Sequence, residues 1–116
     1  MKPNIIKEKS FQFAINIFQF TNYLNVQKGE YVISKQLLRA GTSVGANVRE
    51  SEHAESRLDF KHKLNIALKE INETIFWIDI LIKSNFENSK QIHDLKNDAD
   101  QILAILISII KKLKEK

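Results

Sequence analysis

Small residues and two of the chain's three glycines are concentrated in residues 39–50, RAGTSVGANVRE. A phosphate-binding loop would need glycine, four residues, and then Gly-Lys-Ser/Thr after a strand. Gly41 and Gly45 are instead four positions apart, Ala46 and Asn47 follow them, and no strand is predicted before them. We therefore expect no nucleotide-binding loop here.

Acid and histidine pairs lie just after this segment, as Glu50-x-x-His53 and Asp59-x-x-His62. Four-helix bundles can bind two metal ions with Glu-x-x-His on two helices and a glutamate on each of the others. Both pairs point away from the apolar stripes of their helices and lie beside the same break between helices. We expect solvated residues at helix ends and no metal site.

Nucleophilic catalysis has no better support in the sequence. Serines and the histidines His53, His62 and His93 are present, but no nucleophile-elbow sequence places a base beside a particular serine. Glu70 and Glu73 are three residues apart, and we interpret them as the polar edge of a subunit contact rather than a functional carboxylate pair. We therefore expect no catalytic residue, no cofactor and no enzyme activity.

The bulk composition predicts one domain spanning 1–116, with a core that needs no covalent staple. The absence of cysteine excludes disulfides and thiolate metal sites and agrees with a cytoplasmic protein. The first residues lack the continuous apolar segment of a signal peptide. Residues 10–27 carry no charge but include six asparagine and glutamine side chains, which favours a buried helix over a membrane span.

Helical periodicity runs through the whole chain, and β-type alternation is nowhere sustained. The sequence predicts four helices, at about residues 7–25, 30–53, 56–83 and 89–114. Ser56 followed by Asp59 predicts a capped start for the third helix. Short connections favour an all-α, antiparallel up-down four-helix bundle.

Apolar stripes predict the core and also an excess of apolar surface. The third helix has the clearest stripe, formed by Phe60, Leu64, Ala67, Leu68, Ile71, Ile75, Ile78 and Ile82. The second has a lighter one, formed by Ile33, Leu37, Ala40, Val44 and Val48. The first helix has two nearly opposite apolar faces, one with Phe11, Ala14, Ile15 and Phe18 and one with Phe13, Ile17, Phe20 and Leu24.

Only one of the two apolar faces of the first helix can meet the core. The fourth helix also has more apolar surface than a surface helix needs, because residues 102–110 contribute to an apolar arc of roughly 200°. Exposed patches of this size are usually covered by a partner, so we expect a homo-oligomer. The candidate interface residues are Phe13, Ile17, Phe20, Leu24, Trp77, Ile105 and Ile109. The alternative is that long helices cover these faces within one chain.

The formal net charge of +4 mildly favours the binding of polyanions. The candidate nucleic-acid-binding residues are Lys35, Arg39 and Arg49 on the second helix and Lys111, Lys112 and Lys114 at the end of the fourth. The alternative is a solvated surface and a basic helix end that suits the macrodipole. Repetition around an oligomer would multiply phosphate contacts and strengthen the binding interpretation.

On a helix, the opening segment gives a polar seam, because Arg39, Ser43, Asn47 and Glu50 follow at spacings of four, four and three. Its two glycines align one turn apart. Glycine inside a helix costs roughly 1 kcal/mol relative to alanine, so two are more easily tolerated where another backbone comes close.

Residues 36–51, QLLRAGTSVGANVRES, and residues 59–81, DFKHKLNIALKEINETIFWIDIL, resemble the small bacterial four-helix bundle proteins that include the 23S rRNA intervening-sequence proteins. The first segment is similar to the family pattern Q-hydrophobic-x-R-A-x-x-S-I/V-x-x-N-I/V-x-E-G, and the second to its third helix. This chain departs from the pattern at Ser51, where glycine is usual, and at Arg49, where a small residue is common.

The resemblance implies an antiparallel bundle that assembles into a homopentameric ring, with Arg39, Ser43, Asn47 and Glu50 as a structural signature. The family is also similar to the accessory protein of diversity-generating retroelements, a basic pentamer that associates with a reverse transcriptase and nucleic acid. That similarity lies at the level of the fold. Our leading hypothesis is a non-enzymatic oligomer that binds RNA, DNA or a reverse-transcriptase-like ribonucleoprotein partner through a basic surface. The alternative is a structural oligomer or protein–protein adaptor.

Overall fold

Four helices make up the computed structural model, which describes residues 3–114 and contains no strand within that range. Their bounds are Pro3–Lys28 for α1, Val32–Ser51 for α2, Arg57–Lys83 for α3 and Lys90–Lys114 for α4. The first is longer at both ends than expected, and the other three begin and end within two residues of the expected ranges.

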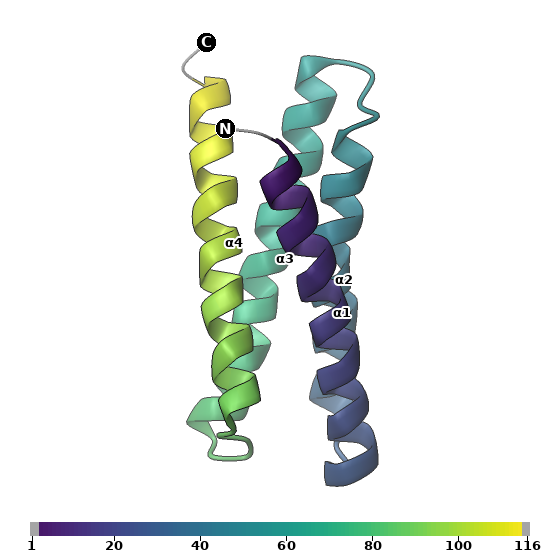
Figure 1. Cartoon of the computed structure of the whole chain (residues 1–116), viewed down its shortest axis with the longest axis vertical. Helices are drawn as coiled ribbons and strands as arrows, with labels where there is room; N and C mark the ends of the chain where they lie inside the picture. Colours follow the sequence, from purple (N-terminus) through teal and green to yellow (C-terminus); the bar gives the residue numbers. More distant parts are fainter. Residues whose placement is uncertain (1–2, 115–116) are drawn as a thin grey trace.

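The helices run alternately up and down, so that α1 begins and α4 ends at the same end of the bundle (Figure 1). Each packs on two neighbours, in the pairs α1 with α2, α2 with α3, α3 with α4, and α4 with α1. The molecule measures 47 × 21 × 19 Å. No helix among the described residues is long and apolar enough to cross a membrane.

Local sequence signals account for the helix ends. Ser56 is the N-cap of α3, with extended backbone, and its Oγ accepts the backbone N–H of Asp59 at 3.0 Å, as expected. The Asp59 carboxylate in turn accepts the backbone N–H of Glu55 at 3.2 Å. Gly29 after α1 and Asn85 after α3 both have positive φ, which glycine and asparagine tolerate best.

The start of α2 uses a cap that the sequence did not reveal. Tyr31 at the N-cap position offers no side-chain bond to the helix. The Glu30 carboxylate instead accepts the backbone N–H groups of Val32, Ile33 and Ser34 at 3.0, 2.8 and 2.7 Å. A carboxylate at this point satisfies three otherwise unpaired donors and also complements the helix dipole.

The core follows the stripes expected for α2 and α3. On α2, Leu37, Ala40, Val44 and Val48 are buried, and Ile33 is partly buried. On α3, the fully or nearly fully buried stripe residues are Leu64, Ala67, Ile71 and Ile78. Phe60, Leu68, Ile75 and Ile82 pack against this core at its edge.

The expected subunit interface on α1 is wrong. Phe13, Ile17, Phe20 and Leu24 are at most 1% exposed and belong to the core of a single chain. The opposite face is the exposed one, with Phe11 and Phe18 on the surface. The face with Phe13 and Ile17, together with buried Ile6, carries large apolar residues along most of α1. The face with Phe11 and Phe18 continues instead into asparagines. Burial of the face with Phe13 and Ile17 therefore removes more apolar area from water. Of the other expected interface residues, Trp77, Ile105 and Ile109 are partly buried against the core.

The two glycines of α2 lie where α1 crosses it closely. A Cβ built on Gly41 would lie 2.9 Å from both Cγ atoms of Ile17, and one on Gly45 would lie 3.0 Å from the backbone oxygen of Ser10. The expected role of the glycines in close helix packing is therefore confirmed.

Candidate functional site

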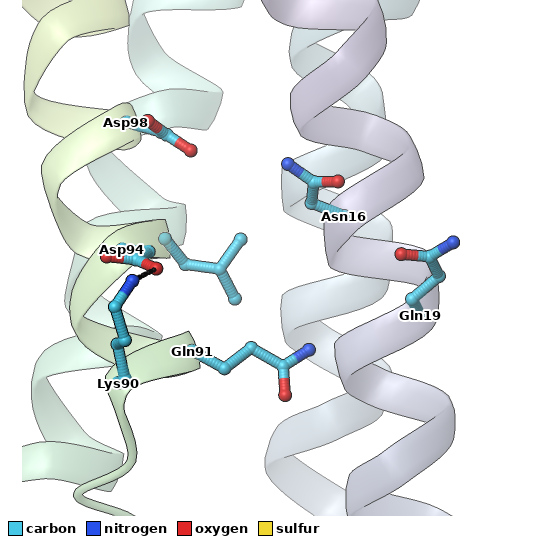
Figure 2. A pocket seen from close by; sticks show the side chains of 7 residues that line it. Asn16, Gln19, Lys90, Gln91, Asp94 and Asp98 are labelled. Carbon is cyan, nitrogen blue, oxygen red and sulfur yellow. Dashed lines mark hydrogen bonds and ion pairs between the residues drawn. The ribbon is translucent and has the colours of Figure 1, made fainter.

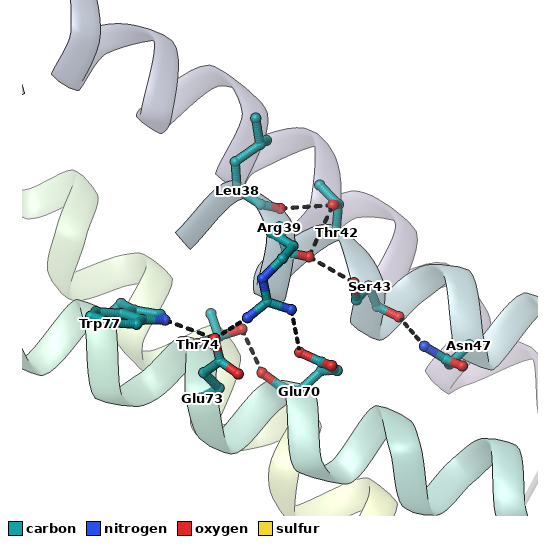
Figure 3. Close-up of polar contacts among 9 residues, drawn as sticks. All are labelled: Leu38, Arg39, Thr42, Ser43, Asn47, Glu70, Glu73, Thr74 and Trp77. Carbon is teal, nitrogen blue, oxygen red and sulfur yellow. Dashed lines mark hydrogen bonds and ion pairs between the residues drawn. The ribbon is translucent and has the colours of Figure 1, made fainter. Parts of the chain in front are cut away.

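A polar network joins α2 to α3 and is centred on Arg39 (Figure 3). Its guanidinium donates to Glu70 Oε1 at 3.3 Å and also to Glu73 Oε2. Trp77 Nε1 donates to the same Glu73 oxygen at 3.1 Å. These three α3 residues lie on successive turns of one helix edge, so Arg39 reaches two carboxylates at once.

The network shifts the pKa values of Glu73 and Arg39. The hydrogen bond from Trp77 and the hydrogen bond and charge of Arg39 lower the pKa of Glu73, and they outweigh the opposite effect of burial. The hydrogen bond to Glu73 and the charges of both carboxylates raise the pKa of Arg39. Arg39 therefore has its charge matched within the chain, and the structure does not support it as a residue that contacts phosphate.

The remaining signature residues also serve the fold. Ser43 Oγ donates to the Arg39 carbonyl at 2.7 Å, and Asn47 Nδ2 donates to the Ser43 carbonyl at 2.9 Å (Figure 3). Glu50 accepts Lys63 Nζ at 3.0 Å across the α2–α3 gap. The seam expected from the 39–50 segment thus exists, and it links α2 to α3 at its two ends.

Glu70 and Glu73 on α3 were expected to form the polar edge of a subunit contact. Glu70 and Glu73 in fact bind Arg39 of the same chain. That arrangement suits a structural ion pair, and the lowered pKa of Glu73 disfavours its taking up a proton near neutral pH.

The other candidate cations are exposed. They are Lys35, Arg49, Lys111, Lys112 and Lys114, and none forms an ion pair with a described residue. The Arg49 guanidinium lies 5.3 Å from the ring centroid of Phe11, within the range of a cation–π contact. Arg57 at the start of α3 donates to the Leu113 carbonyl at 3.1 Å, which brings another cation beside the basic end of α4.

The three histidines lie at the two ends of the bundle. His53 is exposed in the α2–α3 connection and His62 in the second turn of α3, whereas His93 Nε2 lies 2.6 Å from Asn88 Oδ1 at the other end. Within residues 3–114 no group of three histidine, aspartate or glutamate side chains is placed to hold a metal ion.

Grooves lie between neighbouring helices on the outside of the bundle. The α1–α4 groove, of about 330 Å³, has a mostly polar lining, and Asn16 of α1 and Gln91 of α4 point into it from opposite sides (Figure 2). Two further grooves lie between α1 and α2, one of about 350 Å³ beside Phe11 and Arg49 and one of about 340 Å³ beside Tyr31 and Lys35. A smaller cavity of about 210 Å³ lies where the ends of all four helices meet.

A buried carboxylate in the α3–α4 connection escaped the sequence analysis. Glu87 is 4% exposed, accepts the Tyr23 hydroxyl at 3.3 Å, and pairs with Lys28 Nζ at 3.4 Å. Lys28 also lies 5.1 Å from the ring centroid of Phe86. These contacts fasten the connection to the end of α1, across more than fifty residues of sequence, so no local pattern could reveal them.

Comparison with known proteins agrees with the fold. The family model for 23S rRNA-intervening sequence proteins matches residues 2–108. The structure is similar to the crystal structure of a protein of unknown function from the S23 ribosomal protein family of Bacteroides thetaiotaomicron, with a TM-score of 0.91 and 50% sequence identity over 96% of this chain and 99% of that chain. No curated protein matches the chain. The resemblance found in residues 36–51 and 59–81 is thereby confirmed, and the chain belongs to the 23S rRNA-intervening sequence protein family.

Proposed function

We propose that this protein is a non-enzymatic oligomer that binds RNA through exposed basic side chains. The proposal rests on five basic side chains that are exposed and form no ion pair with any residue from 3 to 114. They are Lys35, Arg49, Lys111, Lys112 and Lys114. Unpaired surface cations are available to replace the counterions of a phosphate backbone. Arg39 is removed from the set because Glu70 and Glu73 bind it.

A binding role is favoured over catalysis because the glutamates of the α2–α3 network and of the α3–α4 connection already have structural partners. Glu70 and Glu73 bind Arg39, Glu50 binds Lys63, and Glu87 binds Tyr23 and Lys28. A general base works best when its pKa lies near the working pH. Glu73, whose pKa is lowered, is shifted in the opposite direction.

Oligomer formation is supported by apolar side chains that one chain leaves exposed. Phe76, whose ring packs edge-on against Trp77 with centroids 5.1 Å apart, is 56% exposed on α3. Leu58 and Ile107 add exposed apolar area on α3 and α4. We place the subunit contact on these two helices and, from family membership, propose a pentamer. Light scattering after size exclusion tests the assembly, and a monomeric mass would contradict it.

RNA binding is tested by fluorescence anisotropy with a labelled RNA over a range of salt concentrations. Wild-type affinity should fall as salt rises, with a log–log slope of about −0.7 for each phosphate neutralised on a single strand. The triple variant Lys111→Ala/Lys112→Ala/Lys114→Ala and the double variant Lys35→Ala/Arg49→Ala should each bind more weakly and with a shallower slope. Lys90→Ala is the matched control because Lys90 is exposed but paired with Asp94.

The outcomes separate this proposal from the adaptor alternative. Salt-independent binding, or affinity that survives both basic variants, would contradict binding through these cations. Failure of wild-type protein to bind RNA at low salt, together with capture of a defined protein partner, would favour a protein–protein adaptor.

A further inference from the structure

Three aromatic rings stand in solvent along one side of the bundle, where α1 and α2 run together. Phe11 and Phe18 of α1 are 53% and 63% exposed, and Tyr31 at the start of α2 is 64% exposed. Large aromatic side chains usually bury most of their area, so three exposed rings on two adjacent helices need an explanation. We call the surface formed by Phe11, Phe18, Tyr31, Lys35 and Arg49 the α1/α2 face.

The rings share one side of the bundle because of helical spacing. Phe11 and Phe18 are seven residues apart, which is about two turns and about 10 Å along α1. Phe11 lines one α1–α2 groove together with Arg49, and Tyr31 lines the other together with Lys35. By helical spacing Phe18 projects between the two grooves, so the rings follow one line along the bundle.

Small and polar residues, together with Leu38, line the two grooves between the rings. The groove beside Phe11 is floored by Ala14, Gly45 and Ala46. The groove beside Tyr31 includes Thr21 and Asn25. Asn25 Oδ1 accepts the Ser34 hydroxyl at 2.8 Å, which fixes the amide and leaves its NH₂ group as a donor in this groove.

The charge of the α1/α2 face is positive. Lys35 and Arg49 lie fourteen residues apart on α2, or about 21 Å, and both are exposed. Glu30 and Glu50, which neighbour this face in the sequence, are already engaged, since Glu30 caps the start of α2 and Glu50 pairs with Lys63. Arg49 additionally lies over the Phe11 ring, so a cation and an aromatic face are presented together.

We propose that the α1/α2 face binds single-stranded RNA, with bases stacked on Phe11, Phe18 and Tyr31 and phosphates held by Lys35 and Arg49. Aromatic rings that alternate with cations along a groove are how proteins bind single strands with little sequence preference. The rise of about 21 Å along α2 between Lys35 and Arg49 is long enough for several nucleotides of a single strand. This inference rests on the proposed function and specifies which surface and which form of RNA that function uses.

Duplex RNA fits the α1/α2 face less well, because its bases are stacked on one another and cannot reach the rings.

A second copy of the chain is also a poorer occupant. Two copies that met through this face would bring Lys35 and Arg49 of each copy near cations of the other, and Glu30 and Glu50 already have other partners.

The experiment compares ring chemistry at one position. Fluorescence anisotropy is measured with a labelled twelve-nucleotide oligouridine for wild type, Phe18→Leu and Phe18→Trp. Phe18→Leu keeps the apolar character but removes the stacking surface, so affinity should fall about tenfold, whereas Phe18→Trp should bind as tightly as wild type or more tightly. Phe86→Leu is the matched control, since Phe86 is an exposed aromatic residue of the α3–α4 connection and belongs neither to the α1/α2 face nor to the proposed subunit contact. Its RNA affinity should equal that of wild type.

Each other result has a distinct meaning. Equal affinities for wild type and Phe18→Leu, with binding still lost in the triple lysine variant of α4, would overturn this inference and leave the proposed function standing. No RNA binding by wild type would overturn both. A Phe18→Ser variant that changes the oligomer mass in light scattering would show that the α1/α2 face joins subunits and would overturn the stacking proposal. Tighter binding to a duplex of equal length would do the same.

Discussion

Gly41→Ala is the most informative single change, because helix propensity and packing predict opposite results. An alanine in an open helical position stabilises by about 1 kcal/mol relative to glycine. At residue 41 the new Cβ would lie 2.9 Å from Cγ1 and Cγ2 of Ile17, which is fully buried. Ile17 is β-branched and has one favoured rotamer in a helix, so it cannot turn aside. Overpacking costs about 1–3 kcal/mol, and we expect a net destabilisation of about 1 kcal/mol.

A double-mutant cycle isolates the contact. Ile17→Ala alone should cost about 2–5 kcal/mol because it removes buried atoms and leaves a cavity. Both Cγ atoms are then gone, so Gly41→Ala should stabilise the Ile17→Ala protein by about 1 kcal/mol, which gives a coupling of about 2 kcal/mol. Urea unfolding followed by circular dichroism and by Trp77 fluorescence measures all four proteins. One protein concentration is used throughout, since the stability of an oligomer depends on it.

Ala46→Gly is the control, because residue 46 is exposed on the same helix and should lose about 1 kcal/mol through propensity alone. Stabilisation by Gly41→Ala in the wild-type background, or simple additivity of the two substitutions, would refute the reasoning. The glycine would then have no packing role against Ile17.

Three further predictions concern caps and charges. Glu30→Ala should destabilise the protein by about 1–2 kcal/mol in urea unfolding, because three backbone N–H groups of α2 lose their acceptor; no change would show that water replaces the carboxylate. Ser56→Ala should cost about 1 kcal/mol and Ser56→Gly only a few tenths, and equal losses would contradict its role as N-cap of α3. The lowered pKa of Glu73 contributes stability that is fully present above the pKa of an unfolded-chain glutamate and is lost as pH falls through the lower folded value. Melting temperatures between about pH 7 and pH 3 should therefore fall more for wild type than for Glu73→Gln, and parallel curves would contradict the shift.

Local patterns in the sequence predicted most of the fold. The α2 and α3 stripes and the Ser56 cap depend on residues within one or two turns, so periodicity and spacing suffice to find them. The choice between the two apolar faces of α1 is not local. It depends on which face can pack against Gly41 and Gly45, and the predicted subunit interface therefore fell on the face that is buried in the core.

The candidate site was less predictable for the same reason. The exposure of Lys35 and Arg49 follows from their position opposite the α2 stripe, and the sequence indicated it. The neutralisation of Arg39 depends on carboxylates more than thirty residues away, and the pairing of Glu87 with Tyr23 spans 64 residues. Long-range pairs of this kind require the tertiary structure.

The glycines of α2 also bear on the order in which the helices form during folding. A helix of twenty residues that contains two glycines and several β-branched residues is a weak helix when isolated. α3 and α4 contain no glycine and are joined by a short connection, so they can form and pair early through local contacts. We therefore expect α2 to become fully helical only as α1 docks on it. Substitutions in its glycine segment should then mainly change the unfolding rate and leave the folding rate nearly unaltered.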